Sequence, residues 1–147
     1  TNVLSYIQSG NLIFDAKAKI GPIEIERAIA QIIESNYGYE VSVFAFQNAW
    51  LRQVIAENPY LKEDGIEPKQ LYLTILDRVP NEEAIARLES FETGADEYTI
   101  KGSVIYLRYP NGAGKAKLTN NLIESKLKLR ATSRNWNTTK KLLELSQ

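Results

Sequence analysis

Two complete absences restrict the residues that could carry chemistry in this chain. Its 147 residues contain no Cys and no His, which excludes thiolate nucleophiles, disulfides, imidazole bases and the usual zinc sites. Carboxylates, Lys, Tyr and hydroxyl groups remain. The adjacent pairs Glu63-Asp64 and Glu82-Glu83 are expected at exposed positions, where they act as solvating or helix-start charges. We therefore predict no metal site and no cofactor, and favour a non-enzymatic role.

The segment Asn111–Lys117 is a candidate anion site. We expect it between a strand and a helix, where backbone N–H groups and the helix dipole favour a phosphate. It is not a P-loop, because Lys115 is followed by Ala116 and the first required Gly is absent. The structural alternative is that Thr119 or Asn120 caps the following helix. The candidate ligand contacts are Lys115, Lys117, Thr119 and Asn120.

A second candidate lies near the carboxyl terminus. The segment Arg134–Thr138 places a guanidinium and an indole among carboxamides, a set that can stack a base and bind its edge. In the alternative interpretation, Trp136 anchors a core and Asn135, Asn137 or Thr138 caps the last helix. The candidate contacts are Arg130, Arg134, Asn135, Trp136 and Asn137.

A third polar segment lies near the amino terminus. Gln8, Ser9 and Asn11 surround Gly10 in a predicted tight turn, where amides and carboxamides can meet a ligand. The alternative is a hairpin turn whose side chains bind only the local backbone. Gln8, Ser9 and Asn11 are the ligand candidates here.

Charge divides the chain into an acidic and a basic part. Residues 1–100 contain 8 Lys or Arg and 16 Asp or Glu, whereas residues 101–147 contain 10 and 2. A basic carboxyl-terminal part suits an anionic ligand, although a folded chain can also bring its two parts together.

The first part of the chain shows four predicted elements and then a helix. Val3–Ile7 and Leu12–Phe14 read as a hairpin, and apolar residues with helical spacing from Ile25 predict a helix that follows Pro22 and ends near Gly38. Val41–Phe46 reads as a strand. Asn48 is the predicted N-cap of a helix that stops before Pro59. Residues 59–70 read as a connector.

The second part repeats an alternation of strands and helices. We expect a strand at Leu71–Leu76, a helix opened by Pro80–Glu83, and a hairpin formed by Glu97–Ile100 and Val104–Tyr109. A helix beginning around Leu118, a short strand at Lys128–Ala131 and a final helix follow.

These elements predict an α+β protein made of two ferredoxin-like (split βαβ) units. Residues 1–58 form the first unit with a linking helix, residues 59–70 the connector, and residues 71–147 the second unit with the carboxyl-terminal helix. The first unit lacks its opening strand and helix. Because the sequence has no Met, we expect an amino-terminally truncated fragment.

Two motifs carry a family resemblance. The segment Tyr6–Asn11, and later Lys117–Asn120 followed by Thr132–Thr138, resemble the domain of unknown function 1697 family of bacterial proteins. The family usually has an additional opening strand and helix, which this chain lacks. The resemblance implies the fold and names candidate residues, and it implies no activity.

Three functional hypotheses follow. The first is a non-enzymatic module that binds a phosphate-bearing ligand, a nucleotide or single-stranded nucleic acid, through the basic carboxyl-terminal part. The second is a small-molecule enzyme with a site between Tyr6–Asn11 and Arg134–Thr138. The third is a protein interaction module, including a homo-oligomer. With no apolar run near 20 residues and no Cys, we expect a cytoplasmic protein without a membrane partner.

Overall fold

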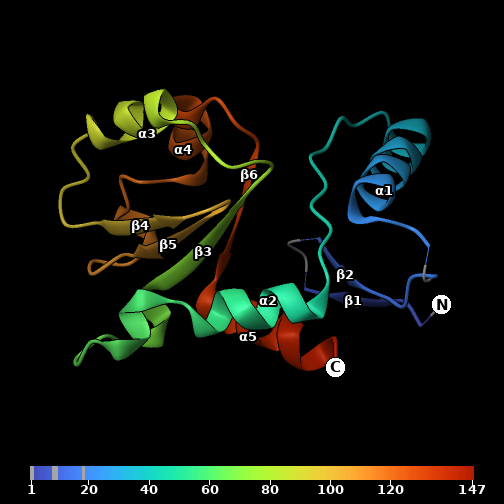
Figure 1. The fold of residues 1–147 in the computed structure, drawn as a ribbon, viewed down its shortest axis with the longest axis horizontal. Helices are drawn as coiled ribbons and strands as arrows, with labels where there is room; N and C mark the ends of the chain where they lie inside the picture. Colours follow the sequence, from blue (N-terminus) through green and yellow to red (C-terminus); the bar gives the residue numbers. More distant parts are fainter. Residues whose placement is uncertain (1, 8–9, 18) are drawn as a thin grey trace. The chain divides into compact units, whose positions relative to one another are not determined.

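The chain folds into two compact units (Figure 1). The computed structural model describes residues 2–7, 10–17 and 19–147. Unit 1 comprises residues 1–56 and 140–147, and unit 2 comprises residues 57–139. Helices and antiparallel sheets occur in the same chain, which confirms the α+β class.

Unit 2 is built on a four-stranded antiparallel sheet. Its strands are β3 (Leu71–Leu76), β4 (Glu97–Lys101), β5 (Val104–Arg108) and β6 (Ala131–Asn135). The strand order is β4-β5-β3-β6, so the two central strands are β5 and β3. A two-residue turn joins β4 to β5, and Gly102 there has a φ of 58°, a value that favours glycine.

Two helices cover one face of this sheet. They are α3 (Glu82–Glu89) and α4 (Asn120–Leu127), which lie side by side in Figure 1. Leu88 of α3 and Ile123 of α4 are fully buried in the same core as Ile105 and Leu107 of β5. Burying these side chains supplies most of the driving force for folding of the unit.

Side-chain caps fix where these helices begin. The N–H of Ala84 donates to Asn81 Oδ1 over 2.8 Å, and the N–H of Leu122 donates to Thr119 Oγ1 over 3.2 Å. Both bonds satisfy an amide that has no partner inside the helix. The predicted helix start at Pro80–Glu83 is confirmed.

Three short 3-10 helices complete unit 2. They are η1 (Pro59–Lys62), η2 (Pro68–Gln70) and η3 (Ala113–Lys115). The first two occupy the predicted connector, and the structure groups that segment with unit 2. Tyr60 of η1 is buried, and its hydroxyl lies 3.3 Å from Thr99 Oγ1 on β4.

Unit 1 contains a hairpin and two helices of its own. The hairpin pairs β1 (Leu4–Tyr6) with β2 (Asn11–Ile13), and the helices are α1 (Pro22–Tyr37) and α2 (Asn48–Ala56). Helix α1 ends at Gly38, whose φ of 72° closes the helix in the left-handed conformation. Helix α5 (Trp136–Leu145) begins in unit 2 and contributes residues from 140 onward to unit 1.

Three predictions from the sequence need correction. Val41–Phe46 is not a strand, because no neighbouring strand pairs with it in the described chain. Asn48 is the first residue of α2 and not its cap, and its Nδ2 donates to the carbonyl of Ser146 over 2.9 Å. The strand predicted at Lys128–Ala131 instead runs from Ala131 to Asn135, where it pairs with β3.

Candidate functional site

The segment Asn111–Lys117 already holds an anion from the protein itself. Oδ2 of Asp96 accepts the N–H of Lys117 over 2.7 Å and the N–H of Leu118 over 3.0 Å. Asp96 is only 8% exposed. These amides, where the sequence analysis predicted a phosphate, therefore already bind the carboxylate of Asp96, which no motif indicated.

The lysine side chains of this segment face solvent. Lys115 and Lys117 are exposed, and the Lys117 side chain runs beside Gly94. A Cβ at Gly94 would lie 3.4 Å from the Cδ, Cε and Nζ atoms of Lys117. That distance is an ordinary van der Waals contact, so the lysine side chain packs beside this turn, where the φ of 64° favours glycine.

Asn120 does not contact a ligand-facing surface. Its Nδ2 donates to the carbonyl of Ala131 over 3.1 Å, and its Oδ1 accepts the hydroxyl of Ser133 over 2.7 Å. The hydroxyl of Ser133 lies 2.6 Å from that of Thr74, which is fully buried. Because Ser133 has already donated its one hydrogen to Asn120, Thr74 is the donor in this second bond.

Glu124 completes the same network. Its Oε2 accepts the N–H of Ala131 over 3.0 Å, and its Oε1 lies 3.5 Å from Asn120 Nδ2. The network thus connects α4 to the edge strand β6. The structure brings together the two parts of the carboxyl-terminal motif, Asn120 and Ser133, through hydrogen bonds that hold the fold.

The two arginine candidates are already engaged. Arg134 Nη1 donates to Thr132 Oγ1 over 2.7 Å and to the carbonyl of Ser133 over 2.9 Å. Burial lowers the pKa of the Arg134 guanidinium. Arg130 is exposed, and its Nε lies 3.4 Å from Asp77 Oδ2. Neither arginine is positioned as an isolated phosphate contact.

The segment that follows β6 starts the last helix. Oδ1 of Asn135 accepts the N–H of Thr138 over 2.8 Å, so Asn135 is the N-cap of α5. Trp136 is 2% exposed. We therefore correct the expected stacking role, because a buried indole has no open face for a base. Asn137 is exposed in the first turn of α5.

The structure describes only part of the amino-terminal motif. Asn11 is 8% exposed, and its Nδ2 donates to the carbonyl of Tyr6 across the hairpin over 3.1 Å. Gln8 and Ser9 lie outside the described residues. This motif belongs to unit 1, whereas Arg134–Thr138 belongs to unit 2. A common site for the two motifs remains a prediction.

Four lysines around α4 have no acidic partner within the described part of the chain. They are Lys115, Lys117, Lys126 and Lys128. Lys126 lies over the ring of Phe91, with Nζ 5.7 Å from the ring centroid. The carboxylate of α4, Glu124, is directed at Ala131 and Asn120 and does not neutralise them. We call these four side chains the α4 lysine surface.

Two buried tyrosines of unit 2 are unsuited to proton transfer at neutral pH. Burial raises the pKa of Tyr106 to about 12. Burial, together with the nearby Asp96 charge, raises the pKa of Tyr109 further, and its hydroxyl donates to the carbonyl of Leu118 over 2.6 Å. Both phenols stay protonated and serve the core.

No cluster of three potential metal-binding side chains occurs among residues 2–7, 10–17 and 19–147. Within the same ranges, no helix is long and apolar enough to cross a membrane. A hollow of about 470 Å³ lies between α3 and β4, and its lining includes Val79, Ile85, Tyr98 and Ile100.

Comparison with known proteins places the chain in a family. Neither the curated proteins nor the solved structures gave a match. Residues 1–106 match the family described as "Protein of unknown function (DUF1697)", so the match includes the hairpin of unit 1 and ends within β5. Because it spans more than half of the 147 residues, the chain belongs to the DUF1697 family.

Proposed function

We propose that this protein is a non-enzymatic binding module for a phosphate-bearing ligand, and that the ligand is single-stranded nucleic acid. The binding face is the α4 lysine surface. The observation that supports the proposal is the set of four lysines without acidic partners in the described chain, together with a carboxylate on α4 that is directed into the protein. Such uncompensated cations favour a polyanion.

The spacing of the lysines favours an extended ligand over a mononucleotide. Lys117 precedes α4 and Lys128 follows it. Eight helical residues span about 12 Å, so one phosphate group cannot contact both ends of the helix. A strand with several phosphates can do so.

The structure of the carboxyl-terminal motif indicates whether the protein would contact the bases or the phosphates of the ligand. With Trp136 buried and Asn135 capping α5, base stacking and edge recognition have little support. Binding then depends on phosphate neutralisation and not on sequence. Arg130 is exposed but paired with Asp77, and Asn137 lies in α5, at the opposite end of β6 from α4 (Figure 1). Neither side chain therefore belongs to the proposed binding face.

Binding to single-stranded RNA and DNA at two salt concentrations tests the proposal. For four lysine contacts we expect log Kd to change with log salt by a slope of about 3. The double variant Lys115→Ala/Lys117→Ala is expected to reduce that slope by about 1.4, because two phosphate contacts are lost. A mononucleotide is expected to bind much more weakly than an oligonucleotide.

Two controls keep this test specific. Lys62→Ala removes another exposed lysine, in η1, and is expected to leave binding unchanged. Lys115→Arg/Lys117→Arg keeps the charge and is expected to retain the slope. Unchanged affinity in the alanine double variant, or no binding at low salt, would show that the α4 lysine surface is not a nucleic-acid site.

We also propose that unit 2 is a ferredoxin-like unit. Its element order β3-α3-β4-β5-α4-β6 and its strand order β4-β5-β3-β6 support this assignment. A cytoplasmic location remains a prediction based on the absence of Cys, and cell fractionation is its direct test.

A further inference from the structure

The outer edge of β4 carries unpaired backbone groups. β4 is an edge strand, since among the residues that the structure describes only β5 pairs with it. On β5, the odd-numbered residues face β3: the N–H of Tyr109 donates to the carbonyl of Gln70, and the N–H of Leu76 donates to the carbonyl of Ser103, both over 2.8 Å. Because strand residues alternate, the even-numbered residues of β5 face β4.

This alternation fixes which groups of β4 point away from the sheet. Glu97, Thr99 and Lys101 lie opposite the even-numbered residues of β5 and bond to them. Tyr98 and Ile100 therefore direct their N–H and C=O groups outward. No backbone bond within the described residues satisfies these groups. An edge of this kind is a template for another strand.

The sequence of β4 is complementary to itself in the antiparallel direction. The strand reads Glu97-Tyr98-Thr99-Ile100-Lys101. We propose that a second copy of this chain pairs with β4 edge to edge, about a two-fold axis through Thr99, to form a homodimer with a continuous eight-stranded sheet. Charge complementarity favours a second copy as the partner. In an antiparallel pair of β4 strands, Glu97 of each copy meets Lys101 of the other.

The two-fold register agrees with the hydrogen-bonding pattern. Tyr98 of one copy stands opposite Ile100 of the other, and these are the residues with outward N–H and C=O groups. Thr99 stands opposite itself, and Glu97 stands opposite Lys101 of the second copy. These last positions are non-hydrogen-bonded pairs, in which the Cα atoms are about 4.5 Å apart and side chains approach most closely.

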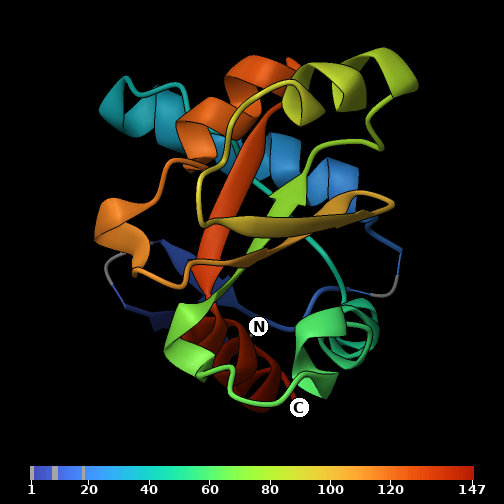
Figure 2. The same ribbon diagram turned by 90° about the vertical axis from the view of Figure 1, so that its left-hand side faces the viewer.

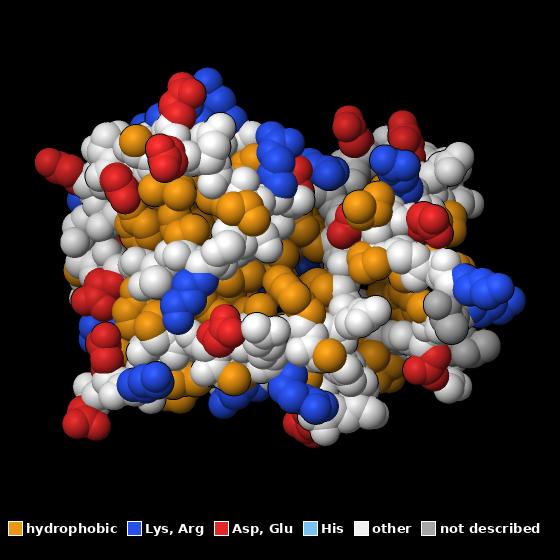
Figure 3. Space-filling view, in the orientation of Figure 1, with side chains coloured by type: hydrophobic (Ala, Val, Ile, Leu, Met, Phe, Trp, Pro, Cys, Tyr) orange, Lys and Arg blue, Asp and Glu red, His pale blue; other side chains and the backbone are white. Residues whose placement is uncertain are grey.

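Apolar surface accompanies the edge on the helix side. Tyr98 and Ile100 line the 470 Å³ hollow between α3 and β4, together with Val79, which is 65% exposed, and Ile85. Figure 3 shows hydrophobic side chains gathered there. In the proposed register, the same two side chains of the second copy extend this apolar strip, which gains stability from their burial.

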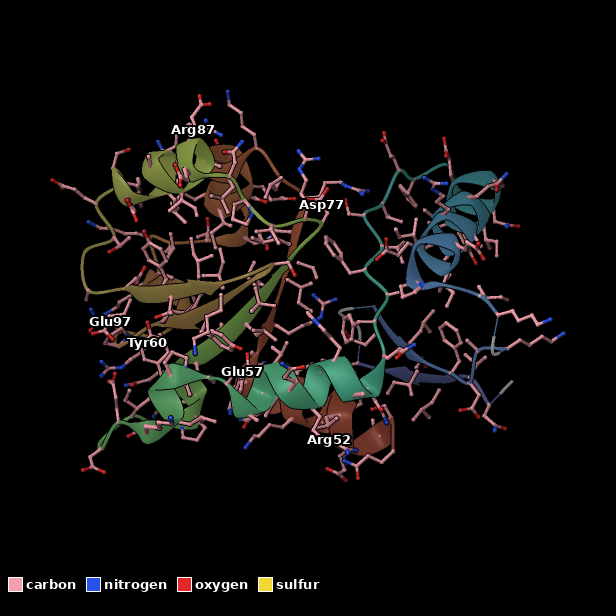
Figure 4. The ribbon with its side chains drawn as sticks, in the orientation of Figure 1. Arg52, Glu57, Tyr60, Asp77, Arg87 and Glu97 are labelled. Atoms are coloured by element: carbon pink, nitrogen blue, oxygen red, sulfur yellow. The ribbon has the colours of Figure 1, made fainter. Side chains whose placement is uncertain are left out.

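Existing contacts hold the two charged side chains near the edge. Glu97 Oε2 lies 3.1 Å from Arg108 Nη1, and Lys101 Nζ donates to the carbonyl of Glu57 over 2.9 Å. Glu97 and Tyr60 lie together at one end of the sheet in Figure 4, and β4 lies at the near edge of the sheet in Figure 2. An ammonium group has three donors, so Lys101 can keep its bond to Glu57 while it pairs with Glu97 of the second copy.

Disulfide trapping tests the register directly, because the chain contains no Cys. Under mild oxidation we expect Thr99→Cys to give a covalent dimer, since the paired Cα atoms lie within the range of about 4.4–6.8 Å that a disulfide bridges. Glu97→Cys is the matched control. In the same register its two copies are displaced by four residues, or about 13 Å, so it is expected not to cross-link. Equal cross-linking at both positions, or none at Thr99→Cys, would overturn the proposal.

Charge reversal tests the pairing without a covalent bond. Two five-residue strands give a small interface, so we expect a Kd of about micromolar magnitude, measured by sedimentation of the full chain. Glu97→Lys and Lys101→Glu are each expected to weaken the dimer about tenfold or more, because each places like charges opposite one another twice.

Mixing distinguishes lost pairing from damage to the fold. When Glu97→Lys and Lys101→Glu are combined in one solution, every cross-strand pair is again of opposite charge, and we expect the dimer to return. Circular dichroism of each variant checks that the monomer is folded. A wild type that sediments as a monomer at millimolar concentration, or folded single variants that dimerise as well as the wild type, would refute the proposal.

Discussion

Of the thirteen large hydrophobic side chains exposed among the described residues, eleven lie in unit 1 and two in unit 2. The buried apolar residues are distributed in the opposite way. Unit 1 contributes Leu51 and Val54, and unit 2 contributes eighteen. Helix α1 has sixteen residues and buries none of them. Burial of apolar side chains therefore stabilises unit 2 far more than unit 1.

The difference shows that an amphipathic pattern needs a partner surface. Ile25, Ile29 and Ile32 have the helical spacing of a core face, and α1 forms as predicted. The two-stranded sheet of unit 1 is three residues long in each strand, which is too small to cover such a face. In unit 2, α3 and α4 pack on a four-stranded sheet, which buries the apolar face of each helix.

The largest expected difference between the units is in the free energy of unfolding lost when a large aliphatic side chain is replaced by alanine. Leu88→Ala removes a fully buried side chain from the core of unit 2 and is expected to lower the free energy of unfolding by about 2–5 kcal/mol. Ile32→Ala, at a position that is 59% exposed on α1, is expected to change it by less than about 0.5 kcal/mol. Urea unfolding followed by circular dichroism measures both. Similar losses in the two variants would contradict the contrast.

A second pair compares carboxylates that accept backbone amides. Asp96→Ala leaves the buried amide of Leu118 and the part-buried amide of Lys117 without this acceptor, and we expect a loss of about 2–3 kcal/mol in the free energy of unfolding. In unit 1, Glu26 Oε1 accepts a single bond, from the N–H of Ala45 over 2.8 Å. Glu26→Ala is expected to cost about 1 kcal/mol or less. The same unfolding measurement applies, and a larger loss for Glu26→Ala would reverse our ranking of the two units.

The smallest contrast concerns asparagine side chains on helices. Asn120→Ala breaks bonds to Ala131 and Ser133 and is expected to destabilise the chain by about 1–2 kcal/mol. The amide of Asn36 donates to the carbonyl of Ile32 on the same exposed helix, so Asn36→Ala is expected to stay within about 0.5 kcal/mol. If Asn120→Ala were neutral in thermal unfolding, the polar network between α4 and β6 would have no structural role.

The candidate site could be predicted only in part. The glycines and lysines of Asn111–Lys117 indicated an exposed turn before a helix, and Thr119 does cap α4. Nothing in the local sequence placed Asp96 on the amides of Lys117 and Leu118, because that contact joins residues about twenty positions apart. A carboxylate just before a strand gives no signal of the amides it will meet.

One strand predicted from the sequence is absent from the described residues, and one observed strand was predicted at the wrong residues. Both errors have the same physical cause. Val41–Phe46 is apolar enough for a strand, but no strand in the described part of the chain pairs with it. Ala131–Asn135 is polar, yet it forms β6, because β3 offers it a ladder and because Thr74 and Asn120 bind its Ser133 hydroxyl. Amino-acid composition describes the side chains of a segment. A strand also requires a neighbouring strand to which its backbone can hydrogen-bond, and composition does not reveal that neighbour.

The sequence by itself determined the α+β class, the start of α3, the end of α1 and the β4–β5 hairpin, since caps, proline, glycine and apolar spacing act over a few residues. The tertiary structure decided that Trp136 is buried, that Asn120 serves a hydrogen-bond network, and that β4 rather than β5 is an edge. These outcomes depend on contacts between segments distant in sequence, and no local propensity encodes such contacts.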